Sequence, residues 1–202
     1  MTKLIKIKIF SIIAFFVMIN YVFASSFSAE KDFVSNFADS AINILSDTEI
    51  SEGKKNSQFT DLVMSAIDLN LISKFVLSKS WKNATDDQKE RYIKAFKDYF
   101  INSYANKLDQ YSGEQVEVVD AEEAGKYVIV NSYIYREGTD TLKINLKWRL
   151  LNRDGEIKII DLNIEGISLI IAQREEFQSF LANNDNSLDA LINKLNSINN
   201  KN

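Results

Sequence analysis

The segment from Ile157 to Phe177 constrains the fold of this chain more than any other, because it joins a strand pattern to a helix pattern with almost nothing between them. Residues 157–164 read as a strand, yet apolar side chains occur on both of its faces. Such a strand needs cover on both faces, or a ligand on one of them. Gly166 stops the strand pattern, Ser168 suits a helix N-cap, and apolar residues then recur at helical spacing. The sequence therefore predicts a final sheet strand leading into a helix that folds back across the sheet.

The apolar spacing of the preceding residues changes from the helical period to the period of two that is typical of strands. Apolar stripes predict helices over 30–45 and 86–109, the second of them aromatic-rich. Strand patterns lie at 116–118, 127–135, 142–150 and 157–164. Helix-start signals occur at Asp68, Thr85 with Gln88, Ser168 and Ser187. This order predicts an α+β fold, with helices packed against a curved antiparallel sheet of about four strands.

The first 24 residues have the pattern of a secretory signal peptide. Lys3, Lys6 and Lys8 precede an apolar run, and Val22-Phe23-Ala24 has small residues where signal peptidase requires them. The alternative is an uncleaved anchor, but the run of about 16 residues is shorter than the roughly 20 that span a bilayer. We therefore expect cleavage near Ala24 and an exported, periplasmic protein with one domain at 25–202.

Composition excludes several classes of protein. The first 24 residues hold three Lys and no acidic residue, so 21 basic and 28 acidic residues remain, a net charge of −7. An acidic chain is a poor partner for nucleic acid, and we expect none. The absence of His excludes Ser–His and Cys–His nucleophiles and makes a zinc site unexpected, while the absence of Cys excludes disulfides and a lipid-modified Cys.

Two groups of charged residues are candidates for function. Asp161 and Glu165 could act as an acid–base pair, although a capping or loop-bracing role is the more economical interpretation, with Arg174 as a partner of either. Lys143, Lys147 and Arg149 alternate along one strand. This basic stripe is either a solvated sheet face, a place for a phosphate headgroup or a docking surface for an acidic partner.

The motif Asp161…Glu165-Gly166-Ile167-Ser168-Leu169…Arg174…Phe177 resembles the signature of the MlaC, or toluene-tolerance, family of periplasmic phospholipid carriers. Upstream, Phe75-Val76-Leu77…Trp81…Ala84-Thr85…Gln88 resembles a second segment of that family. The resemblance covers roughly 33–195. It departs at Ser78, where the family usually has Gly, at Ile157, where Trp is frequent, and at Gln173, where an aromatic residue is common.

The resemblance implies a carrier that encloses acyl tails in an apolar cavity between the sheet and the helices, with phospholipid as cargo and no cofactor. It also implies traffic between an inner-membrane ABC transporter complex with a lipid-binding ring subunit and an outer-membrane lipoprotein complex, which maintains outer-membrane lipid asymmetry. Combining one helical stripe with alternating strand faces, we expect ten residues to contact the lipid: Phe96, Phe100, Tyr104, Val130, Ile134, Leu146, Trp148, Ile160, Leu162 and Leu169.

Two other classes of function remain open from the residues alone. One is an enzyme on a cone-shaped α+β scaffold that uses Asp161 as its base. The other is a non-catalytic envelope assembly protein with a filled core. We interpret the chain as a carrier and not an enzyme chiefly because of the family resemblance. The apolar, aromatic-rich composition without a convincing catalytic constellation also fits an ordinary core, and by itself it indicates only an exported soluble α+β domain.

Overall fold

The computed structural model describes residues 27–105, 113–136, 138 and 143–200. The first helices are α2 (Ser28–Ser46), α3 (Glu52–Ala66), α4 (Leu69–Leu77), α5 (Lys79–Asn83) and α6 (Asp86–Ala105). The strands are β1 (Glu114–Ala124), β2 (Tyr127–Arg136), β3 (Ile144–Arg153), β4 (Glu156–Ile164) and β5 (Ile167–Ser168), followed by α7 (Leu169–Ala182) and α8 (Leu188–Asn199).

The sheet is antiparallel throughout, and its spatial order β1-β2-β3-β4-β5 follows the chain. Four strands match the predicted ones, and β5 adds a short fifth strand beside β4. The register shifts between Val118 and Asp120, and again opposite Arg149 and Leu150, where Ile160 is the extra residue. Such bulges bend a strand and increase its twist, which accounts for the curvature of the sheet. The predicted α+β fold is confirmed.

Helices α4, α6, α7 and α8 begin at the caps that the sequence predicts, whereas α2 begins at Ser28, before the predicted start at residue 30. Thr85 Oγ1 accepts from the Gln88 N–H at 3.2 Å, and Gln88 Oε1 accepts from the Thr85 N–H at 3.1 Å, which completes a capping box. The side chains of Asp68, Ser168 and Ser187 accept hydrogen bonds from the first turns of α4, α7 and α8. Each cap satisfies a backbone donor that the helix itself cannot pair.

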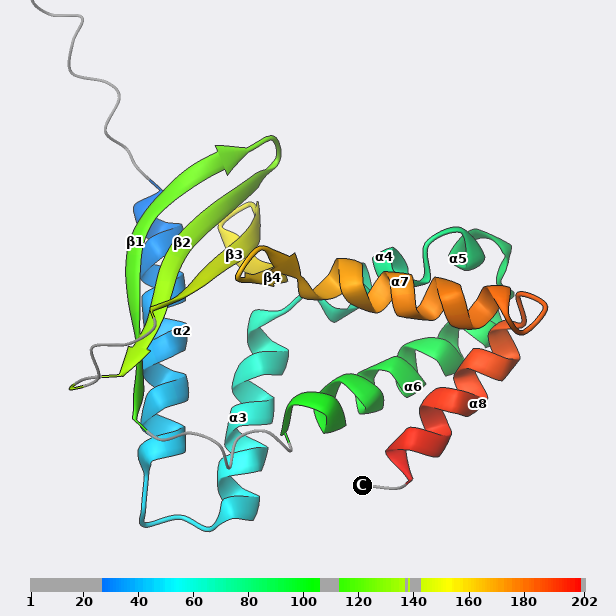
Figure 1. The fold of residues 1–202 in the computed structure, drawn as a ribbon, viewed down its shortest axis with the longest axis horizontal. Coiled ribbons are helices and arrows are strands. Elements are labelled where there is room, and N and C mark those ends of the chain that lie inside the picture. Colours follow the sequence, from blue (N-terminus) through cyan, green and yellow to red (C-terminus); the bar gives the residue numbers. More distant parts are fainter. Residues whose placement is uncertain (1–26, 106–112, 137, 139–142, 201–202) are drawn as a thin grey trace, which may run out of the picture.

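Two layers of helices meet the sheet. Helix α2 lies along one face, where it contacts β1 and β2 (Figure 1). Val130, Trp148 and Leu150 are fully or almost fully buried on this inner face. Helix α7 runs from β5 to a second helical layer, in which α4 packs on α7 and α6 packs on α8 (Figure 1). The site described below lies where the sheet, α2, α3 and this second layer converge.

Several predictions fall partly outside the described residues. The predicted signal segment, residues 1–24, lies outside them, as do the last residues of the predicted long helix and the first of the predicted third strand. The division into a signal segment and one domain at 25–202 therefore stays a prediction. Within the described ranges, none of the helices is both long enough and apolar enough to cross a bilayer.

Candidate functional site

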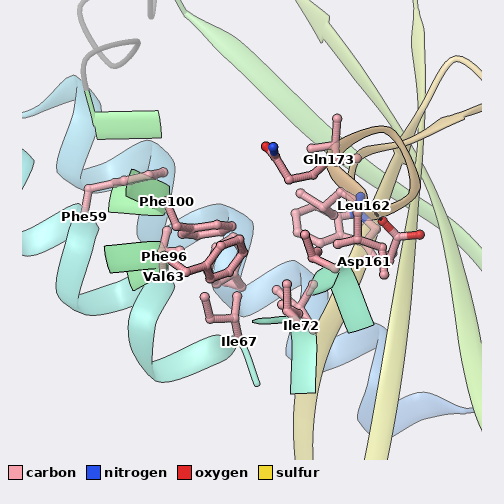
Figure 2. Close-up of a pocket in the computed structure, with 15 residues that line it drawn as sticks. Phe59, Val63, Ile67, Ile72, Phe96, Phe100, Asp161, Leu162 and Gln173 are labelled. Atoms are coloured by element: carbon pink, nitrogen blue, oxygen red, sulfur yellow. Dashed lines mark hydrogen bonds between the residues drawn. The ribbon is translucent and has the colours of Figure 1, made fainter. Parts of the chain in front are cut away.

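A cavity of about 290 Å³ lies between the sheet and the helices (Figure 2). This volume is near the lower bound of the roughly 300–1,000 Å³ that is typical of small-molecule sites. Its walls are apolar except for Asp161 and Gln173. The lining residues are Phe37, Phe59, Val63, Ile67, Ile72, Val76, Phe96, Phe100, Trp148, Ile159, Asp161, Leu162, Leu169, Ile170 and Gln173.

The helical wall is built by aromatic side chains of α6. Tyr92, Phe96 and Phe100 are four residues apart and therefore share one face of the helix. Their ring centroids are 5.7 Å apart for Tyr92 and Phe96, and 6.2 Å apart for Phe96 and Phe100. Phe96 also meets Phe177 of α7 edge-on at 6.1 Å. Phe177, a residue of the family signature, thus packs against the aromatic wall without lining the cavity itself.

The sheet wall is centred on Trp148. Its ring packs edge-on against Phe37 of α2 at 5.6 Å, and its indole N–H donates to Ser132 Oγ at 2.9 Å. Leu162 lies opposite Trp148 on β4. Ile159, three positions before Leu162, also lines the cavity, because the bulge at Ile160 brings both residues to the same face.

Asp161 caps helix α7. Its carboxylate accepts from Ser168 Oγ at 2.7 Å and from the Ile170 N–H at 3.3 Å, and Arg149 lies 3.8 Å away. The side chain is 2% exposed, so water cannot solvate its negative charge. The hydrogen bonds and the nearby Arg149 stabilise that charge instead. The capping interpretation therefore agrees with the geometry.

The predicted pairing of Arg174 with Asp161 or Glu165 is wrong. The Arg174 guanidinium lies over the Phe75 ring, 5.0 Å from its centroid, and Glu165 instead accepts from the backbone N–H and side-chain amide of Asn145. Among the described residues, no group of three His, Cys, Asp or Glu could hold a metal ion.

Gln173 joins the cavity to a polar cluster on the helices. Tyr99 Oη donates to Gln173 Oε1 at 3.1 Å, and Gln173 Nε2 donates to Glu176 Oε2 at 3.0 Å. Burial and then the nearby negative charge of Glu176 raise the pKa of Tyr99, against the opposing hydrogen bonds with Ser103 and Gln173. The Tyr99 hydroxyl therefore remains a proton donor at neutral pH.

Five of the ten predicted lipid-contacting residues line the cavity: Phe96, Phe100, Trp148, Leu162 and Leu169. Val130 and Leu146 are buried on the sheet and Ile134 packs against the core, but none of them lines the cavity. Ile160 is the bulged residue and does not line it either. Tyr104 lies in α6, but its side chain falls outside what the structure describes. Contact of any of these residues with lipid stays a prediction.

Helices α2, α3 and α4 contribute residues to the cavity wall that were not among the predicted lipid contacts. Phe37, Phe59, Val63 and Ile72 come from helical stripes that are visible in the sequence. Those stripes indicate a buried face, but not whether a core or a cavity lies against it.

The three residues of the basic stripe, Lys143, Lys147 and Arg149, differ in whether an acidic residue lies near them. Lys143 pairs with Glu117 at 3.1 Å, and Arg149 approaches Asp161, as described above. Lys147 is exposed, and the structure gives it no acidic partner among the described residues. Of the three stripe residues, Lys147 is therefore the one without an acidic partner among the described residues.

The comparison with known proteins adds to this geometry. The family model for the MlaC protein matches residues 35–197. The chain belongs to the MlaC family. A relative in this family, the intermembrane phospholipid transport system binding protein MlaC of Haemophilus influenzae, is 26% identical over 132 residues. The toluene tolerance protein ttg2D of Pseudomonas putida is 27% identical over 128 residues.

These alignments cover 64% and 62% of this chain, but only 61% and 59% of the two relatives. A phospholipid-binding protein from Ralstonia solanacearum, solved in complex with a phospholipid, has a similar structure. Its TM-score is 0.72 at 21% identity, over 85% of this chain and 97% of that one. The likeness confirms the α+β fold of the MlaC family.

Proposed function

We propose that this protein is a phospholipid carrier that holds acyl tails in the cavity between the sheet and the helices. The observation that carries the proposal is an almost wholly apolar cavity in a member of the MlaC family. Removing a methylene from water is worth about 0.8 kcal/mol, so tails carried bare through water are strongly disfavoured. A carrier therefore needs an enclosed apolar lining, which Phe96, Phe100, Trp148, Leu162 and Leu169 supply in part.

The carrier acts in the periplasm, after cleavage of a signal peptide near Ala24. It shuttles phospholipid between an inner-membrane ABC transporter complex with a lipid-binding ring subunit and an outer-membrane lipoprotein complex, and so maintains lipid asymmetry. The name of the Haemophilus relative, an intermembrane phospholipid transport system binding protein, supports this role. The Lys-rich, apolar start of the chain supports export.

Docking to an acidic partner uses the basic stripe of Lys143, Lys147 and Arg149. Because Lys143 and Arg149 lie near acidic groups of this chain, Lys147 makes the main contribution. Lys147→Glu should weaken partner binding in a salt-dependent manner and leave the bound lipid in place. Unchanged affinity would identify the stripe as a solvated face.

The protein is not an enzyme, and phospholipid is its cargo rather than a cofactor. The role of Asp161 as a helix cap supports this, because a base that already accepts from Ser168 and Ile170 is poorly placed to take a further proton. The envelope assembly alternative requires a filled core, which the cavity argues against.

Native mass spectrometry of periplasmic protein tests the proposal. The carrier should appear as a mature chain beginning at or near Ser25, with phospholipid mass added to it. A bare chain under conditions that preserve a known lipid complex would contradict lipid binding, and a full-length membrane-embedded chain would contradict cleavage.

A further inference from the structure

The side-chain amide of Gln173 is a hydrogen-bonding group with spare capacity on the apolar wall of the cavity. Figure 2 shows it projecting from α7 into the space that faces Phe100. The other polar groups on the wall are occupied, because the carboxylate of Asp161 caps α7 and the Trp148 indole donates to Ser132. A ligand in the cavity therefore meets Gln173 as its available polar contact.

The orientation of this amide follows from its two partners. The Tyr99 hydroxyl donates its one proton to Oε1, and the ionised carboxylate of Glu176 can only accept, so Nε2 faces Glu176. A primary amide nitrogen has two N–H groups. Glu176 takes one of them, and no acceptor for the other is found within the described part of the chain.

The surroundings of this second N–H select the kind of atom that it can bind. Gln173 is half-buried, and an amide N–H that a ligand shuts off from water is unfavourable without an acceptor. A ligand that brings an oxygen to this level therefore binds better than one that does not. The carboxylate of Glu176 lies 3.0 Å from Nε2, and Lys194 approaches it only to 3.7 Å. An anionic phosphate or fatty-acid oxygen is repelled there, whereas a neutral carbonyl oxygen is not.

We infer that Gln173 donates a hydrogen bond to an acyl ester carbonyl of the bound lipid, and so selects ester-linked over ether-linked phospholipids. In a diacyl phospholipid the neutral carbonyls lie where the tails join the glycerol, at the boundary between apolar and polar atoms. Gln173 thus marks the depth at which the glycerol sits. This inference rests on the proposed lipid binding and adds a specificity-determining residue to it.

Competitive loading tests the inference. Delipidated protein is incubated with vesicles that contain equal amounts of a diester and a diether phosphatidylethanolamine of the same chain length, and the bound lipids are quantified by mass spectrometry. The wild-type protein should hold about three- to tenfold more diester than diether lipid, the range expected for one net hydrogen bond. Gln173→Met, which keeps the length of the side chain without its amide, should hold the two lipids about equally.

Gln178→Met is the matched control, because Gln178 is on the same helix but its amide donates to the Leu77 carbonyl oxygen and does not line the cavity. It should keep the wild-type ratio. Equal loading of the two lipids by the wild-type protein, or an unchanged preference in Gln173→Met, would overturn the inference while lipid binding itself stands. Binding of neither lipid by the wild-type protein would contradict the proposed function and the inference with it.

Discussion

The indole N–H of Trp148 on β3 donates to the hydroxyl of Ser132 on β2 at 2.9 Å, and this hydroxyl donates in turn to the Leu146 carbonyl at 3.1 Å. Both side chains are almost fully buried. Because the hydroxyl has one proton and its oxygen can accept another, Ser132 satisfies two buried groups at once. The pair fixes the plane of the Trp148 ring, one side of the proposed lipid cavity.

Replacement of Ser132 by Ala should therefore destabilise the protein. The substitution leaves the buried indole N–H without an acceptor, which costs about 1–3 kcal/mol. Urea unfolding of delipidated protein measures this loss. Ser179→Ala, at an exposed position on α7, is the control and should change the free energy of unfolding by less than about 0.5 kcal/mol. Equal effects of the two substitutions would show that the Ser132 hydroxyl is not needed by Trp148.

Ser78 adopts a backbone conformation that favours glycine. Its φ is +57° and its ψ is −125°, between the end of α4 and the start of α5. Strain of this kind costs on the order of 1–3 kcal/mol in a non-glycine residue. Ser78→Gly should raise the free energy of unfolding by about 1 kcal/mol, which is less than the strain because glycine gains entropy in the unfolded chain. Ser78→Ala is the control and should give no gain; equal stability of the two variants would contradict the prediction.

Stability should fall in alkaline solution because of Tyr92. Burial raises the pKa of Tyr92, whose hydroxyl donates to the Ser73 carbonyl oxygen at 3.1 Å. In the unfolded chain its pKa is about 10, so above that pH the unfolded state loses the proton while the folded state keeps it. The free energy of unfolding is therefore unaffected by this group below about pH 10 and decreases above it.

The Tyr92→Phe variant tests this explanation through the slope of the free energy of unfolding against pH. Loss of the hydrogen bond lowers its stability at pH 7 by about 1 kcal/mol. Above about pH 10 its stability should decline less steeply with pH than that of the wild-type protein. If the free energies of unfolding of the two proteins fall in parallel above about pH 10, groups other than Tyr92 cause the loss of stability.

The sequence predicted the fold well because its signals are local. The passage from β4 through Gly166 to α7, and the capping box of Thr85 and Gln88, each depend on residues that are neighbours in the chain. The family signature at 161–177 proved to be a structural unit, in which Asp161 and Ser168 hold the start of α7 and Phe177 supports the aromatic wall.

The cavity was harder to predict because it depends on register and on contacts between distant segments. Regular alternation along β4 places Ile160 on the same face as Leu162, but the bulge puts Ile159 there instead. A one-residue change of register exchanges the two faces of a strand, and nothing in this apolar run marks the bulge. The apolar stripe with Phe59 and Val63 indicates burial, and only the packing of α3 beside α6 turns it toward the cavity.

Replacement of Leu162 by Trp distinguishes a cavity from a filled core. Leu162 lines the cavity opposite Trp148, so a larger apolar side chain there occupies space that the proposed lipid uses. Leu150 is the matched control, because it is fully buried on the same face of the sheet and does not line the cavity. Leu150→Trp should overpack the core and cost about 1–3 kcal/mol.

The phospholipid that co-purifies with Leu162→Trp, measured beside the melting temperature of the delipidated variant, tests the carrier account most directly. We predict a clear fall in lipid per protein with little change in melting temperature, whereas Leu150→Trp lowers the melting temperature. Wild-type lipid content in a strongly destabilised Leu162→Trp protein would place Leu162 in a filled core and contradict the account.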